Sequence, residues 1–161
     1  MRQTLTVAAV LVTWLALPRH AGAQASPPPP ALTLAAATRI AEAAQAEATR
    51  NQWNVVIAIL DAGAHLVHLR RMDGTQLGSV DVAQEKAKSA VLFRRPTKAF
   101  ADAVTAGRIG VLRLPGAMPI EGGIPLLVGD QVVGAIGVSG VTSEQDGQVA
   151  QAGARAFSAA R

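Results

Sequence analysis

Residues 118–140 constrain the fold more than any other part of the chain. This segment contains two apolar, β-branched runs on either side of Gly129-Asp130, in the order MPIEGGIPLLV-GD-QVVGAIGVSG. Apolar runs that flank a Gly-Asp pair are typical of an antiparallel hairpin closed by a tight turn. The segment therefore predicts paired antiparallel strands, and nothing in it specifies a reaction.

Glycines mark both strands of this hairpin. The Gly122-Gly123 pair lies between Pro119 and Pro125, so the chain enters the hairpin through a constrained corner without side chains. A second series occurs every three residues in the second strand, at Gly134, Gly137 and Gly140. We expect other parts of the backbone to approach that strand closely.

The remaining periodicity predicts helices that alternate with paired strands. From the N-terminus we expect a helix from Thr33 to about Asn51 and then strands over 53–61 and 65–71 joined by a turn. Next come a helix begun by Ser79 or Asp81 and ending near Phe93, and a short helix from Thr97 to Ala106. The hairpin follows, and then a last helix begun by a Ser143–Asp146 capping box. Hairpins surrounded by helices favour an antiparallel sheet and an α+β fold in layers over a doubly wound parallel sheet.

The N-terminus predicts export. Arg2 precedes an apolar run over 5–17 that is short for a membrane span, and small residues over 21–23 suit cleavage before Gln24. Residues 1–23 are therefore predicted to be a cleaved signal peptide, with an uncleaved anchor as the alternative. Four prolines follow, which favours a linker over 24–31 and one domain over 32–161. We expect a periplasmic or secreted protein without a stable membrane anchor.

Composition excludes several classes of function. Without the leader the formal charge falls from +4 to +2, and no run of lysines and arginines exists to bind nucleic acid. The chain has no cysteine, which excludes disulfides, thiol nucleophiles and thiolate metal sites. After the leader only His65 and His68 remain, and their spacing on a strand turns them to opposite faces. They cannot chelate one metal together.

No motif identifies a catalytic centre. The glycine series in the hairpin lacks the order of a dinucleotide fingerprint, and no Walker motif or nucleophile elbow is present. Asp61 suits an Asx-turn, and Glu85 suits surface pairing with Lys86 and Lys88. Glu121 is open to two interpretations, a plain loop position or an acid facing a cleft. We assign no catalytic residue.

Several short words of the sequence, taken in order, resemble one family. They are Asp61-Ala62-Gly63, Arg71-Met72-Asp73-Gly74, Lys86-Ala87, Phe93-Arg94-Arg95-Pro96-Thr97, Leu114-Pro115-Gly116, residues 119–125 and residues 134–140. From about Leu32 onward the chain resembles the GlcG/HbpS-type haem-binding family, also found as the C-terminal domain of PduO-type proteins. The resemblance implies a profilin-like α/β/α layered sandwich with about five antiparallel strands. It also implies a homo-oligomer.

The resemblance further implies haem as a candidate cofactor. In some members a threonine just after the second helix binds the iron, and Thr97 is the matching position, where it is also a candidate helix cap. The first-helix histidine used by other members is absent here. Arg94 and Arg95 would then pair with the propionates. In the same framework Glu121 and the Gly122-Gly123 amides suit a small anion.

Three hypotheses of function follow from these features. The first is an exported binding protein that holds haem or another tetrapyrrole at a subunit edge. The second is an enzyme or auxiliary protein acting on a small carboxylate, as in glycolate-type metabolism, with Glu121 as acid or base and the Gly122-Gly123 amides as anion holder. The third is an oligomeric assembly module without ligand. We favour binding over catalysis.

Overall fold

The computed structural model describes residues 31–159, so the expected signal peptide and most of the Pro-rich linker lie outside the described residues. The described chain forms a four-stranded antiparallel sheet in the order β2-β1-β4-β3. The strands are β1 Val56–Asp61, β2 Leu66–Arg71, β3 Gly123–Val128 and β4 Gln131–Ser139. The antiparallel α+β prediction is confirmed, and the 118–140 segment forms the expected hairpin around Gly129-Asp130.

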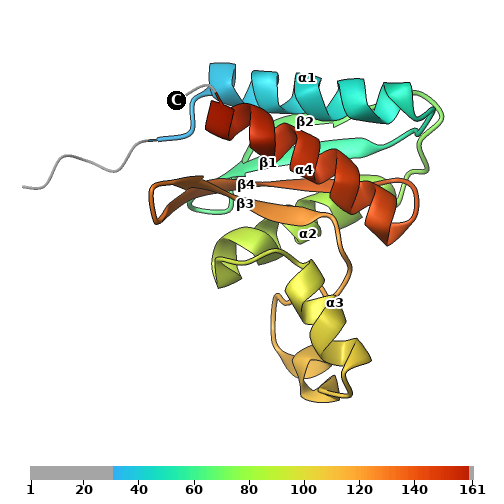
Figure 1. Ribbon diagram of the computed structural model, residues 1–161, viewed down its shortest axis with the longest axis vertical. Coiled ribbons are helices and arrows are strands. Elements are labelled where there is room, and N and C mark those ends of the chain that lie inside the picture. Colours follow the sequence, from blue (N-terminus) through green and yellow to red (C-terminus); the bar gives the residue numbers. More distant parts are fainter. Residues whose placement is uncertain (1–30, 160–161) are drawn as a thin grey trace, which may run out of the picture.

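Helices cover both faces of the sheet (Figure 1). Helices α1 (Leu34–Arg50) and α4 (Ser143–Ala159) lie on one face, and α2 (Ser79–Phe93) lies on the other. A smaller part projects from this sandwich and contains α3 (Lys98–Thr105) and the 3₁₀ helix η1 (Ile109–Arg113). We call residues 98–120 the lobe.

The expectation of about five strands is wrong, because the described sheet has four. The hairpin pairing begins only at Gly123, since Gly122 has a φ of +128°, which no extended strand adopts. Residues 109–113, which precede this corner, form a 3₁₀ helix in the lobe.

The two faces of the sheet have different cores. Ile57 and Ile59 of β1 pack under α1 and α4 with other large side chains. The alternate residues Val56 and Ala58 face α2, whose buried contact surface is mainly alanine. Strand β1 lies between β2 and β4 and is therefore a central strand.

Glycines allow α2 to approach β4 closely, as the sequence predicted. A Cβ atom at Gly137 would overlap the carbonyl oxygen of Ala83 in α2. A Cβ at Gly134 would overlap the carbonyl of Leu60 in β1. The alanine face of α2 therefore rests directly on the backbone of the sheet.

The helix caps agree only in part with the sequence. Thr33 caps α1 as predicted, with its Oγ1 accepting from the N–H of Ala36 at 3.1 Å. The N-cap residue of α2 is Gly78, so neither Ser79 nor Asp81 is the cap. Ser79 is buried instead and its Oγ accepts a hydrogen bond from Gln76.

The capping box of α4 lies one residue earlier than predicted. Thr142 Oγ1 accepts from the N–H of Gln145 at 3.4 Å, and Gln145 Oε1 accepts from the N–H of Thr142 at 3.2 Å. Ser143 and Asp146 therefore do not form the box. This shift leaves Asp146 free to point into the protein.

Among residues 31–159, no helix has the length and apolar character needed to cross a membrane.

Candidate functional site

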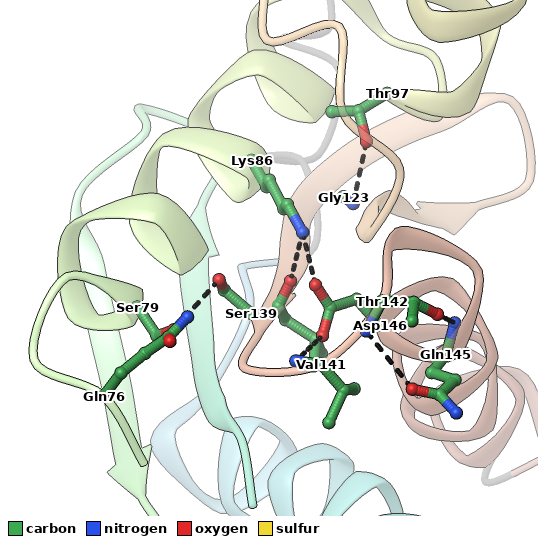
Figure 2. Close-up of polar contacts among 11 residues, drawn as sticks. Gln76, Ser79, Lys86, Thr97, Gly123, Ser139, Val141, Thr142, Gln145 and Asp146 are labelled. Carbon is green, nitrogen blue, oxygen red and sulfur yellow. Dashed lines mark hydrogen bonds and ion pairs between the residues drawn. The ribbon is translucent and has the colours of Figure 1, made fainter. Parts of the chain in front are cut away.

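Four elements meet at one place (Figure 2). They are the loop before α3, the start of β3, α2 through Lys86 and α4 through Asp146. We call this place the junction and define it by Lys86, Thr97, Gly122, Gly123 and Asp146. It holds Thr97 and the Gly122-Gly123 pair, which the sequence singled out, and a buried charge pair that it did not. The junction therefore brings together Thr97 and the glycine pair among the candidate site residues.

A buried ion pair connects α2 with α4. Lys86 Nζ lies 2.7 Å from Asp146 Oδ2 and donates to the Val138 carbonyl at 3.0 Å. The side chains are only 1% and 3% exposed. Asp146 Oδ1 also accepts from the N–H of Val141 at 3.2 Å. Because several bonds satisfy both charges, the pair acts as a structural clamp between the helical layers.

The prediction of surface pairing for Glu85 is confirmed for Lys88, with 3.6 Å between Oε1 and Nζ. It is wrong for Lys86, which is buried. One feature of the sequence indicates that Lys86 is buried. This lysine shares a helix face with Ala83 and Ala90, at spacings of three and four residues. A lysine whose ammonium is buried on such a face needs an acid or other acceptors nearby. Burial raises the pKa of the Asp146 carboxyl, and the hydrogen bond from Lys86 opposes that rise.

Thr97 and Gly123 bind each other. The N–H of Gly123 donates to Thr97 Oγ1 at 2.9 Å, and the N–H of Thr97 donates to the Gly123 carbonyl at 3.0 Å. Thr97 is fully buried and its side chain makes no cap for α3. The expected iron-binding hydroxyl and the expected anion-binding amide are therefore each other's partners. Ligation of iron by Thr97 would require this contact to open.

The Gly122-Gly123 pair is required by packing. A Cβ at Gly122 would lie 2.7 Å from the Val138 carbonyl and 2.9 Å from Lys86 Nζ. A Cβ at Gly123 would overlap the carbonyl of Lys86. The pair thus allows the corner before β3 to lie against α2 and the buried ammonium.

Glu121 lies in the wall of a pocket beside the junction. The pocket has a volume of about 220 Å³. Its lining includes the Gly122-Gly123 corner together with Pro96, Lys98, Glu121, Ile124, Gly147 and Gln151. We call it the Glu121 pocket. Desolvation in this wall raises the pKa of the half-buried Glu121 carboxyl. The positive charge of Lys98 opposes this rise, and the negative charges of Glu144 and Asp102 add to it.

Arg94 and Arg95 are directed away from the junction. Arg94 ends α2 in a left-handed conformation with φ of 52°, and its guanidinium lies 3.4 Å from the Asp130 carbonyl. Arg95 donates to the Phe93 carbonyl at 3.2 Å and stacks 5.7 Å from the centre of the Phe100 ring. The structure thus separates the two arginines from Thr97, Glu121 and the glycine pair.

The lobe exposes apolar side chains on its outer surface. These are Ile109, Leu112, Leu114 and Ile120, which we call the lobe surface. Arg108 and Arg113 are exposed in the same segment. Neighbouring exposed apolar residues bordered by charged ones mark sites of interaction. The lobe surface is therefore open to a ligand or partner.

Neither histidine of the described chain completes a metal site. His65 has a side chain 82% exposed beside Asp61, in the turn before β2. His68 lies in β2, where its Nε2 atom is buried without a hydrogen bond and desolvation lowers the pKa of the ring. Residues 31–159 contain no group of three or more histidines and acids arranged to hold a metal ion.

Comparisons with known proteins agree with this architecture. Residues 32–155 match the family model described as "Haem degrading protein HbpS-like". Protein GlcG of Escherichia coli is 44% identical over 103 residues, which are 64% of this chain and 77% of GlcG.

Two solved structures relate the fold to haem-associated proteins. A double mutant of HbpS from Streptomyces reticuli matches with a TM-score of 0.73 and 32% identity, covering 88% of this chain and 97% of that chain. A PduOC:Heme complex matches with a TM-score of 0.71 and 28% identity, covering 78% of this chain and 94% of that chain.

Proposed function

Because the chain belongs to the HbpS-like family, we propose that it is a haem-binding protein that receives the macrocycle on its lobe surface. The observation that carries this proposal is the exposed group of Ile109, Leu112, Leu114 and Ile120 beside exposed arginines. Haem presents a flat apolar ring with two carboxylates at one edge. The lobe surface offers the matching combination of apolar side chains and guanidinium groups.

The size of the Glu121 pocket supports a surface position for haem. Its volume of about 220 Å³ is below the roughly 300–1,000 Å³ of pockets that enclose drug-sized ligands. A tetrapyrrole would therefore lie outside it, with Arg108 and Arg113 as candidates for the propionates. Bound haem would supply a redox-active iron. The described residues fit the ring and the propionates, whereas the buried Thr97 hydroxyl fits the iron only after its contact with Gly123 opens.

A haem titration tests the proposal. We expect saturable growth of the Soret band and quenching of Trp53, the only tryptophan in residues 24–161. Leu112→Glu should weaken haem binding at least about tenfold, because it places a charge under the ring. The matched control is Leu34→Glu on α1, since Leu34 is 62% exposed and Leu112 is 60% exposed. Equal loss in both variants, or no saturation in the wild type, would refute binding on the lobe surface.

A separate pair of variants tests Thr97. We expect Thr97→Val to lower the melting temperature and leave the Soret maximum unchanged, because the hydroxyl is bonded to Gly123. Thr97→Ser keeps the hydroxyl and serves as the control. A Soret maximum that moves in Thr97→Val and not in Thr97→Ser would assign the iron to Thr97.

A homo-oligomer is the second candidate that the lobe surface supports. A second copy seated on the same apolar residues would cover one side of the haem or, without ligand, the patch itself. Light scattering at micromolar concentration should give a mass above one chain. Leu112→Glu should lower that mass, and a monomeric wild type would exclude the assembly.

We also propose that the protein acts in the periplasm or outside the cell. The support is the apolar run over 5–17 and the small residues over 21–23. Expression in a Gram-negative host should give a protein in the periplasmic fraction that begins at Gln24. An intact Met1 in the cytoplasmic fraction would refute export.

A further inference from the structure

Glu121 differs from every other carboxylate that is at least partly buried in residues 31–159. Glu47 is bonded to Arg50 and Gln148, Asp61 to the amides of its turn, and Asp146 to Lys86. Glu121 alone among these four forms no hydrogen bond or ion pair with the described residues, and it lies in the wall of the Glu121 pocket. Its carboxylate is partly desolvated there and has no fixed donor. The pocket therefore presents an acceptor that a ligand can use.

The charges around the pocket favour a cation. The nearby positive groups are Lys98, which is 2.6 Å from Asp102, and Lys86, which is 2.7 Å from Asp146. Both ammonium groups are thus already matched by an aspartate. Glu121 and its neighbour Glu144 have no such match among the described residues. Lys98 also lines the pocket and its positive charge acts on Glu121, but it is shared with Asp102 and Glu144. Negative groups thus outnumber positive ones around the pocket, which disfavours a small carboxylate.

The backbone also disfavours an anion in this pocket. The Gly123 N–H, which the sequence suggested as an anion holder, donates to Thr97 Oγ1 at 2.9 Å. The Glu121 carboxylate lies against Gly147 of α4, where a Cβ would overlap Oε1. The remaining lining consists of Pro96 and Ile124, which are apolar, and of the polar side chains of Lys98 and Gln151.

We propose that the Glu121 pocket is a binding site for a small organic cation, a primary ammonium on a short apolar chain. The ammonium donates to the Glu121 carboxylate, and the apolar chain packs against Pro96 and Ile124. A cavity of about 220 Å³ limits the ligand to a small metabolite, since drug-sized molecules need about 300 Å³ or more. This site is separate from the lobe surface and does not depend on haem binding.

Three probes of equal chain length test the proposal on the wild-type protein. Butylammonium, 1-butanol and butyrate are titrated at constant ionic strength, and the amide resonances of Gly122, Gly123 and Gly147 are followed by NMR. We expect butylammonium to bind saturably and at least about tenfold more tightly than 1-butanol, because it adds a hydrogen bond between charged groups. Butyrate should bind most weakly. Equal binding of butylammonium and butanol, tighter binding of butyrate, or no saturable shift would each overturn the proposal.

Variants assign the effect to one carboxylate. Glu121→Gln should weaken butylammonium binding about tenfold while leaving the butanol affinity unchanged. Glu144→Gln is the matched control, because Glu144 contributes charge and does not line the pocket, and we expect about a twofold change. Leu112→Glu should not change butylammonium binding, which separates this site from the haem proposal. An unaltered affinity in Glu121→Gln would refute the assignment.

Discussion

The junction lies where the lobe joins the sheet, and the lobe surface lies on the projecting part. The two regions place polar and apolar side chains in opposite ways. At the junction a lysine and an aspartate are buried, and every charged atom has a partner. On the lobe surface leucine and isoleucine side chains face solvent. A buried charged group whose hydrogen bonds are all satisfied within the chain needs no ligand or partner. Neighbouring exposed apolar groups mark a site of interaction, so the lobe surface indicates a ligand or partner, whereas the buried ion pair does not.

The largest expected effect comes from breaking the junction. Lys86→Ala should lower the free energy of unfolding by about 3–5 kcal/mol, because it leaves the Asp146 carboxylate buried without its partner. Urea denaturation measures the loss. Lys88→Ala is the matched control on the exposed side of α2, with an expected change within about 0.5 kcal/mol.

A double variant separates charge from packing at the same place. Lys86→Met combined with Asp146→Leu should recover most of the stability, since removal of both charges leaves neither unpaired. A Lys86→Ala variant as stable as Lys88→Ala would show that the ion pair does not hold the layers together.

Removal of the capping box of α4 should reduce stability by a smaller amount, and it tests whether Asp146 belongs to the box or to the junction. Thr142→Ala should cost about 1 kcal/mol, whereas Ser143→Ala should have little effect. Thermal unfolding of the two variants decides the register of the helix start. If Ser143→Ala were the more harmful change, Asp146 would belong to the box and could not serve Lys86.

Substitutions on the lobe surface should have almost no effect on stability. Leu112→Ala should change the free energy of unfolding by less than about 0.5 kcal/mol. Leu126→Ala, at a position only 1% exposed, should cost about 2–5 kcal/mol. A large loss in Leu112→Ala would mean that Leu112 serves the fold and would weaken the case for an external partner.

The smallest effect concerns the pH dependence of Glu121. Its pKa is raised by desolvation, so the folded state holds the proton more firmly than the unfolded state. Stability contributed by this proton is full below the ordinary pKa of a glutamate and is lost as pH rises through the raised value. The melting temperature of Glu121→Gln should therefore exceed that of the wild type near neutral pH, and the difference should shrink on acidification. A difference independent of pH would exclude Glu121 as its source.

The sequence predicted local structure where one segment determines it alone. The hairpin around Gly129-Asp130 and the Thr33 cap depend on residues within or next to their own element. The pairing of distant segments was not predictable in the same way. Lys86 and Asp146 are 60 residues apart, and no local pattern states which acid would reach a lysine on an apolar helix face.

The candidate site shows the same limit. Placing Glu121 beside a rigid glycine corner identified a residue in a pocket wall. The hydrogen bond from the Gly123 amide to Thr97 could not be predicted from the sequence, because it forms only once the fold places Thr97 beside the start of β3. The one-residue shift at the start of α4 arose because Thr142-Gln145 and Ser143-Asp146 both match a capping pattern, and burial of Asp146 decides between them.

The alanine and glycine contact between α2 and β4 has a mechanical consequence. Ala83, Ala87 and Gly137 have no side-chain torsions, so this layer cannot absorb a displacement by changing rotamers. The opposite layer, with its isoleucines and Phe157, can repack. A force applied to the lobe would therefore pass through α2 as a rigid shift along the sheet, and the compliant side of the molecule would be the one beneath α1 and α4.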